Sequence, residues 1–138
     1  MKKVYLLLFV MLFSSCSDSV TETYIDIKTA REAGLFDRGW LPDILPETTT
    51  NLTLSNDLDL NCSEGEFYFH PKDTQAFFSK TKRVLGEECI SNIKNTTLKN
   101  VANCKVLRFA AEGYSWIFYC VKERGYCRYV MMPIYPAK

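Results

Sequence analysis

Apolar and polar residues alternate along several short stretches of the chain, as they do in strands that have one buried face. The clearest case is residues 52–60, where Leu52, Leu54, Leu58 and Leu60 are separated by mostly polar residues. A second strand is predicted for residues 66–70, after a turn at residues 63–65. Three aromatic-rich runs follow at residues 105–110, 114–121 and 126–135.

Gly113 and Gly125 separate the last three runs, and glycine suits the left-handed positions of hairpin loops. These runs therefore predict consecutive antiparallel strands. Together with the two earlier strands they predict an antiparallel sheet of about five strands.

Two segments predict short helices. Residues 29–36 have apolar positions at helical spacing, with Thr29 as the expected N-cap and Glu32 three residues later. A second helix is expected from Asp73 to about residue 85, where Gly86 ends it. With both helices packed on the sheet, the predicted fold class is α+β, in a single small domain that covers residues 24–138.

The first fifteen residues have the pattern of an export signal. Lys2 and Lys3 precede a run of ten uncharged residues, 4–13, and small residues follow the run. A helix of ten residues rises about 15 Å, half the hydrocarbon thickness of a bilayer, so the run is too short to span it. We expect residues 1–15 to be removed as a signal peptide.

Phe13-Ser14-Ser15-Cys16 resembles the lipobox of bacterial lipoproteins, in which an apolar residue and two small residues precede a lipid-modified cysteine. The resemblance implies cleavage before Cys16 and a palmitate-bearing lipid on its thiol. Because the residues after Cys16 are mostly polar, residues 16–23 are expected to be the lipidated cysteine and a short linker. Ser17 follows instead of the Asp that favours retention in the inner membrane, so the resemblance implies the outer membrane. The alternative is an ordinary secretory signal with a coincidental cysteine.

The charge balance excludes some classes of partner. The chain has 17 basic and 16 acidic residues, and removal of Lys2 and Lys3 would leave it close to neutral. No long basic tract is present to follow a phosphate backbone, which argues against nucleic acid as a partner. Binding to anionic lipid by charge is equally unsupported.

The remaining cysteines predict disulfides, as is usual for a small exported domain. They are Cys62, Cys89, Cys104, Cys120 and Cys127. Because five is an odd number, two bridges would leave one free thiol, and the spacing alone does not choose among the pairings. A loop at residues 111–113 would place Cys104 opposite Cys120. Buried free thiols remain an alternative, whereas zinc is disfavoured because no Cys-x-x-Cys occurs and His70 is the single histidine.

A stiff segment follows the first predicted helix. Pro42 and Pro46 forbid a helix there, and Gly39 permits a turn before Trp40. We expect Trp40 to pack into the core as a large apolar plug. The alternative is an exposed recognition loop formed by Trp40, Pro42 and Pro46.

Residues 39–46 read Gly-Trp-Leu-Pro-Asp-Ile-Leu-Pro. Through this signature, residues 28–70 resemble a group of small, uncharacterised bacterial membrane-associated proteins. The resemblance covers about a third of the chain and implies no activity.

Candidate chemistry is sparse. His70 is the one side chain that ordinarily titrates near neutrality, and Ser79 or Cys89 would be its nucleophile partner, but no nucleophile motif surrounds either residue.

Asp57-x-Asp59-x-Asn61 matches the first half of a calcium loop. Cys62 replaces the required Gly and the final Glu is missing, so these acids are better explained as the polar face of a strand. We predict no catalytic residues, cofactor or metal.

The sequence therefore predicts an envelope lipoprotein that acts by binding close to its membrane and is not an enzyme. Its expected partners are the membrane, through the lipid on Cys16, and an envelope protein or glycan. One alternative is a small envelope hydrolase that uses His70 or paired acids. Another is a protective lipoprotein of the exclusion or inhibitor type at the cell surface.

Overall fold

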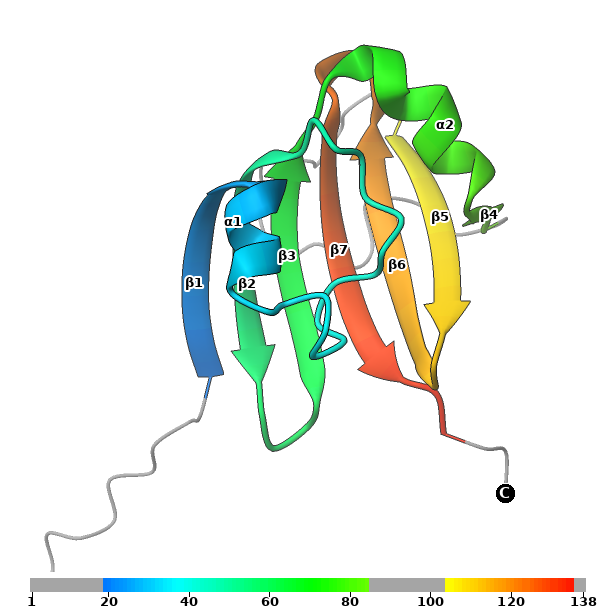
Figure 1. Ribbon diagram of the computed structural model, residues 1–138. Helices are drawn as coiled ribbons and strands as arrows, with labels where there is room; N and C mark the ends of the chain where they lie inside the picture. The colour runs from blue at the N-terminus through cyan, green and yellow to red at the C-terminus, as the bar shows by residue number, and fades with distance from the viewer. Residues whose placement is uncertain (1–18, 85–103, 136–138) are drawn as a thin grey trace, which may run out of the picture.

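The computed structural model describes residues 19–84 and 104–135, which form a seven-stranded antiparallel sheet with two six-residue helices (Figure 1). Across the sheet the strand order is β1-β2-β3-β7-β6-β5-β4. The strands are β1 (Ser19–Asp26), β2 (Thr50–Asp57), β3 (Cys62–Tyr68), β4 (Lys82–Arg83), β5 (Cys104–Ala111), β6 (Tyr114–Val121) and β7 (Tyr126–Pro133). The helices are α1 (Ile27–Glu32) and α2 (Thr74–Ser79).

One face of the sheet is covered by α1 and by the irregular segment 33–49, which crosses it from the β1 side to the middle strands (Figure 1). The core lies between this cover and the sheet. From the sheet it receives Leu52, Leu54, Phe67, Phe118 and Tyr129, and from the cover Ile27, Ala30, Leu35, Trp40, Leu41, Ile44 and Leu45. No helix in the part of the chain that the structure describes is long and apolar enough to cross a membrane.

The prediction of about five strands was too low, chiefly because the sequence does not reveal β1. This strand pairs with β2 from Ser19 opposite Asp57 to Asp26 opposite Thr50. As an edge strand it is largely exposed on both faces, so it lacks the apolar alternation that marks a half-buried strand. The segment predicted as a linker is therefore paired sheet from Ser19 onward.

The alternation predicted for residues 52–60 holds only as far as Asp57. The Asp57 Oδ1 atom accepts hydrogen bonds from the backbone N–H groups of Asp59 and Leu60, both at 3.0 Å. This local bonding ends the strand in a turn. Leu58 and Leu60 consequently lie in solvent, with 57% and 64% of their surface exposed, and do not continue the core face.

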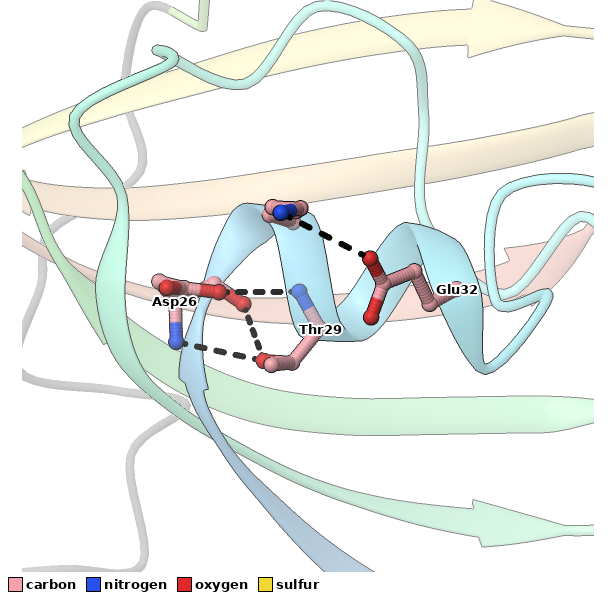
Figure 2. A network of polar contacts seen from close by, with 4 residues as sticks. Asp26, Thr29 and Glu32 are labelled. Atoms are coloured by element: carbon pink, nitrogen blue, oxygen red, sulfur yellow. Dashed lines mark hydrogen bonds and ion pairs between the residues drawn. The ribbon is translucent and has the colours of Figure 1, made fainter.

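Helix α1 begins two residues earlier than predicted. Its N-cap is Asp26, whose Oδ1 accepts from the Thr29 N–H at 2.8 Å, while the Thr29 hydroxyl oxygen accepts from the Asp26 N–H (Figure 2). Thr29 is therefore the N3 residue of the capping box, and Asp26 is the N-cap. Gly34, with φ of 76°, follows the C-cap and ends the helix early.

The predicted helix from Asp73 to residue 85 is much shorter in the structure. A 3₁₀ turn, Pro71–Asp73, precedes α2, and the Asp73 side chain makes no capping bond. After Ser79 the chain leaves the helix, and Lys82 and Arg83 pair with Arg108 and Leu107 of β5. Pairing with the open edge of β5 replaces the last predicted helical turns, which contain the β-branched Thr81 and Val84.

The aromatic-rich hairpins are confirmed. Glu112 and Gly113, both with positive φ, form a two-residue turn between β5 and β6, which fits the twist of the flanking strands. This turn is one residue shorter than predicted, so Cys104 lies opposite Val121 and not opposite Cys120.

A disulfide bond is present, as predicted, and it joins Cys120 of β6 to Cys127 of β7. Both cysteines are fully buried. Cys104 is also disulfide-bonded, and Cys62 is the free cysteine of the described residues. Cys16 and Cys89, like the predicted signal peptide, lie outside the residues that the structure describes.

Candidate binding groove beside the proline segment

The proline segment, residues 39–46, presents different residues to solvent from those predicted for a recognition loop. Trp40, Pro42 and Pro46 are all buried, and only 8% of Trp40 is exposed. The segment exposes its acidic positions, Asp43 and the adjoining Glu47. A recognition surface built on Trp40 is therefore excluded. The groups that this segment offers to a partner are carboxylates.

One arginine holds both acids. Arg31 on α1 donates from Nη1 to Asp43 Oδ1 at 2.8 Å and from Nη2 to Glu47 Oε1 at 3.0 Å. Its guanidinium also lies 4.3 Å from the centre of the Phe36 ring. The hydrogen bond from Arg31 to Asp43, and then the charge of that carboxylate, raise the pKa of the guanidinium above its usual value. Arg31 thereby fixes the proline segment against α1.

A groove opens between this segment and α2, with a cavity of about 460 Å³. Buried apolar side chains of Ile44, Leu45 and Phe77 line its interior. Its charged lining consists of Arg31, Asp43, Glu47, Asp73 and Lys80. More of the accessible lining is polar than apolar, so the groove is a polar and charged site, and its volume is in the usual range for a binding site.

Thr48 connects the groove to the end of β3. Its hydroxyl donates to Asp73 Oδ2 at 2.6 Å and accepts from the backbone N–H of His70 at 3.0 Å. This places the Asp73 carboxylate on the groove lining instead of at the start of α2. Hydrogen bonds therefore fix both sides of the groove: Arg31 holds the acids of the proline side, and Thr48 holds Asp73 on the α2 side.

His70 lies near this joint, but the structure does not bring it together with a nucleophile among the described residues. Its Nδ1 accepts from the Lys72 N–H at 3.2 Å, so the imidazole caps the 3₁₀ turn that follows β3. The Ser79 hydroxyl donates to the Ala76 carbonyl oxygen at 2.8 Å. Cys89, the other predicted partner, lies outside the described residues.

The acids of β3, and Asp57 at the end of β2, have structural partners. Tyr126 donates to Glu66 Oε2 at 2.7 Å, and Arg128 donates to Glu64 Oε2 at 3.3 Å. Burial of Tyr126, and next its bond to Glu66, raise the pKa of the phenol well above its usual value. Asp57 caps its own turn, and the described ranges, 19–84 and 104–135, contain no cluster of three side chains that is suited to hold a metal.

Comparison with known proteins finds a similarity over part of the chain. Residues 18–68 match the family model of the YbbD head domain. The matched stretch covers a little over a third of the chain and runs from β1 through α1 and the proline segment to β3. Neither the comparison with curated proteins nor the comparison with solved structures gives a match.

The groove is thus shared between two parts of the chain. Arg31, Asp43 and Glu47 lie within the stretch that is similar to the YbbD head domain, whereas α2 and Lys80 follow it. Sequence reasoning missed this constellation. Arg31 is 12 residues from Asp43 and 16 from Glu47, and no local periodicity relates positions that only a folded loop brings together.

Proposed function

We propose that this chain is a lipid-anchored envelope protein that acts by binding a partner in the groove between the proline segment and α2. The observation that carries the proposal is the pair of acids held by Arg31 at the groove. A single guanidinium fixes two carboxylates that remain about three-quarters exposed, at 76% for Asp43 and 77% for Glu47. Preorganised and accessible acceptors in a groove of this volume are suited to binding.

The chemistry of the groove indicates what kind of partner fits it. Asp43 and Glu47 keep free oxygen lone pairs, because Arg31 bonds to one oxygen of each. Acidic residues also clearly outnumber basic ones between residues 19 and 73. The partner is therefore expected to offer hydrogen-bond donors or positive charge, as a basic segment of an envelope protein or an amine-bearing glycan would.

The predicted export signal and the resemblance of residues 13–16 to a lipobox support the location that we propose. A lipid on Cys16 would hold the domain at the outer membrane. A chain so tethered needs only modest affinity for an envelope partner, because both are confined to a thin layer and their effective concentration is high.

Site-specific crosslinking in intact cells tests the binding site. A photo-crosslinking amino acid at position 76, in place of an exposed alanine that lines the groove, is expected to give a defined adduct. A probe at Thr23, which is also exposed but lies on the uncovered face of β1, is expected to give none. The adduct should weaken in an Arg31→Ala background, since the carboxylates lose their fixed position. Equal adducts from both probes, or an adduct that is indifferent to Arg31, would contradict the proposal.

The hydrolase alternative is tested on the purified chain. Release of product from ester or cell-wall substrates by the wild type, and its loss in His70→Ala, would replace the binding proposal with an enzymatic one. The position of His70 at a strand end, with Nδ1 occupied by a backbone N–H, favours binding.

A further inference from the structure

A group of exposed apolar side chains gathers at the end of the sheet that contains the β2–β3 and β5–β6 turns, which we call the apolar end. It consists of Val20, Leu58, Leu60, Ile134 and Tyr135, whose exposed fractions run from 44% for Ile134 to 78% for Tyr135. Single exposed apolar residues are common on protein surfaces. Five of them at one end of a small domain are a candidate contact surface.

Backbone pairing shows that these residues share one end of the molecule. Ser19, next to Val20, is opposite Asp57 in the β1–β2 ladder, directly before the turn that carries Leu58 and Leu60. The side chain of Asn61 in that turn hydrogen-bonds to the Tyr114 hydroxyl at the start of β6. The Ile134 N–H donates to the Gly113 carbonyl oxygen at 2.7 Å. All these turns and strand ends lie at the lower end of the sheet in Figure 1.

The length of chain before β1 determines what this end faces. Cys16 is three residues before Ser19, and consecutive Cα atoms are about 3.8 Å apart, so the two residues are separated by at most about 11 Å. A strand of eight residues such as β1 spans roughly 26 Å. A lipid on Cys16 therefore brings the apolar end to the bilayer surface, whereas the α2 end is about a strand length away.

We propose that the apolar end docks onto the bilayer, with Leu58, Leu60, Ile134 and Tyr135 entering its interfacial layer. This inference rests on the lipid anchor of the proposed function and adds a fixed orientation to it. The short tether holds the apolar end close to the lipid. Burial of its apolar side chains then fixes the orientation of the domain relative to the bilayer. Tyrosine is well suited to this position because its ring favours the level of the headgroups.

The charges at this end select the type of lipid surface. Asp57 and Asp59 flank Leu58, and Glu112 lies in the β5–β6 turn, while residues 57–61, 112–113 and 134–135 contain no lysine or arginine. Anionic lipid would repel this surface, and a zwitterionic surface such as phosphatidylcholine or phosphatidylethanolamine would not. Docking is therefore driven by apolar contact and is not strengthened by negative lipid.

The orientation has a consequence for the groove. Helix α2, which forms one wall of the groove, lies at the end of the sheet opposite the β2–β3 turn (Figure 1). Docking through the apolar end directs that wall away from the membrane, where a partner has access to it.

Fluorescence quenching by brominated phosphatidylcholine tests the docking. The chain from Ser17 onward carries an N-terminal polyhistidine tag, which tethers it to nickel-chelating lipid in nanodiscs, so the test does not require native lipidation. In a Leu60→Trp variant the added emission is expected to fall at least twofold with brominated lipid. A Lys72→Trp variant, exposed near α2, is the matched control and should lose none. The parent chain supplies the background from the buried Trp40 and Trp116.

A second arm separates docking from simple proximity. Quenching of a Tyr135→Trp probe should be lost when Leu58→Ser and Leu60→Ser are added, because both leucines are exposed and the fold does not need them. Persistent quenching in that background, or equal quenching at positions 60 and 72, would overturn the proposal. So would stronger quenching when a third of the lipid is replaced by phosphatidylglycerol. Labelling of Cys16 with radioactive palmitate in cells tests the anchor separately.

Discussion

Trp116 on β6 donates a hydrogen bond from its indole Nε1 to the main-chain oxygen of Trp40, 3.3 Å away. The same proline segment is held from its other side by Leu35, whose carbonyl oxygen accepts from the N–H of Trp40 at 3.0 Å. At Trp40 the segment is therefore fixed both to the sheet and to the turn that follows α1. This explains why a stretch without regular structure is able to cover the core.

Loss of the Trp40 side chain is expected to destabilise the domain strongly. Trp40→Ala removes a buried ring from the core and leaves a cavity, which typically costs about 3–5 kcal/mol. Trp40→Phe keeps most of the apolar volume and should cost less, and both variants retain the main-chain oxygen that Trp116 uses. Urea unfolding followed by circular dichroism measures the difference. A loss below about 1 kcal/mol for Trp40→Ala would show that this residue does not plug the core.

The disulfide between β6 and β7 gives a second prediction. The chain-entropy relation for a bridge between residues seven apart gives about 2–3 kcal/mol of stability. The double variant Cys120→Ala and Cys127→Ala should lose roughly that amount in urea unfolding. Cys62→Ala is the matched control, because Cys62 is a free and half-buried thiol, and it should change stability by less than about 1 kcal/mol. Equal losses in both proteins would contradict the assigned pairing.

Gly125 and Gly113 provide a matched pair for the effect of a close backbone approach. Both have positive φ, 55° for Gly125 and 82° for Gly113, so alanine is strained by about 1–2 kcal/mol at either position. A Cβ on Gly125 would also come within 1.9 Å of the Phe69 carbonyl oxygen, whereas nothing lies within 4 Å at Gly113. Gly125→Ala should therefore lower the thermal midpoint clearly more than Gly113→Ala. Similar shifts for the two variants would mean that the Phe69 backbone moves away from the added Cβ without a loss of stability.

The sequence predicts the parts of this fold that depend on neighbouring residues. The hairpins at Gly113 and Gly125 follow from turn residues between β-prone runs, and the structure contains them. Strand β1 is not recognisable, because its pairing with β2 is decided by residues some thirty positions away, and its side chains are mostly exposed. Leu58 and Leu60 continue the alternation of β2 in sequence only, since the Asp57 carboxylate turns the chain before it reaches them.

The candidate groove was even less accessible to sequence reasoning. Its charged lining combines α1, the proline segment and α2, which are distant in sequence and come together only in the folded domain. Trp40 stands out in the sequence because it is large and is flanked by prolines. Its neighbours Asp43 and Glu47 do not, although they are the residues that the segment leaves in solvent.

The capping box of α1 makes a prediction about pH. The backbone N–H of Thr29, and next the Thr29 side chain, hold the pKa of the Asp26 carboxyl below its usual value. Folding therefore favours the ionised form, and the resulting stability is complete above the pKa of an unfolded aspartate, about 3.9. It is lost as the pH falls through the lowered pKa of the folded state.

Asp26→Asn separates this contribution from those of the other carboxylates, because asparagine is an equally good N-cap but does not ionise. Near pH 7 both proteins retain a cap, and the variant is expected to be somewhat less stable because it lacks the charge at the start of α1. Between about pH 4 and pH 2 the advantage of the wild type should disappear, so the two unfolding midpoints should converge. A difference in midpoint that stays constant over this interval would mean that Asp26 titrates as it does in the unfolded chain. An NMR titration of the Asp26 carboxyl carbon measures the same pKa directly.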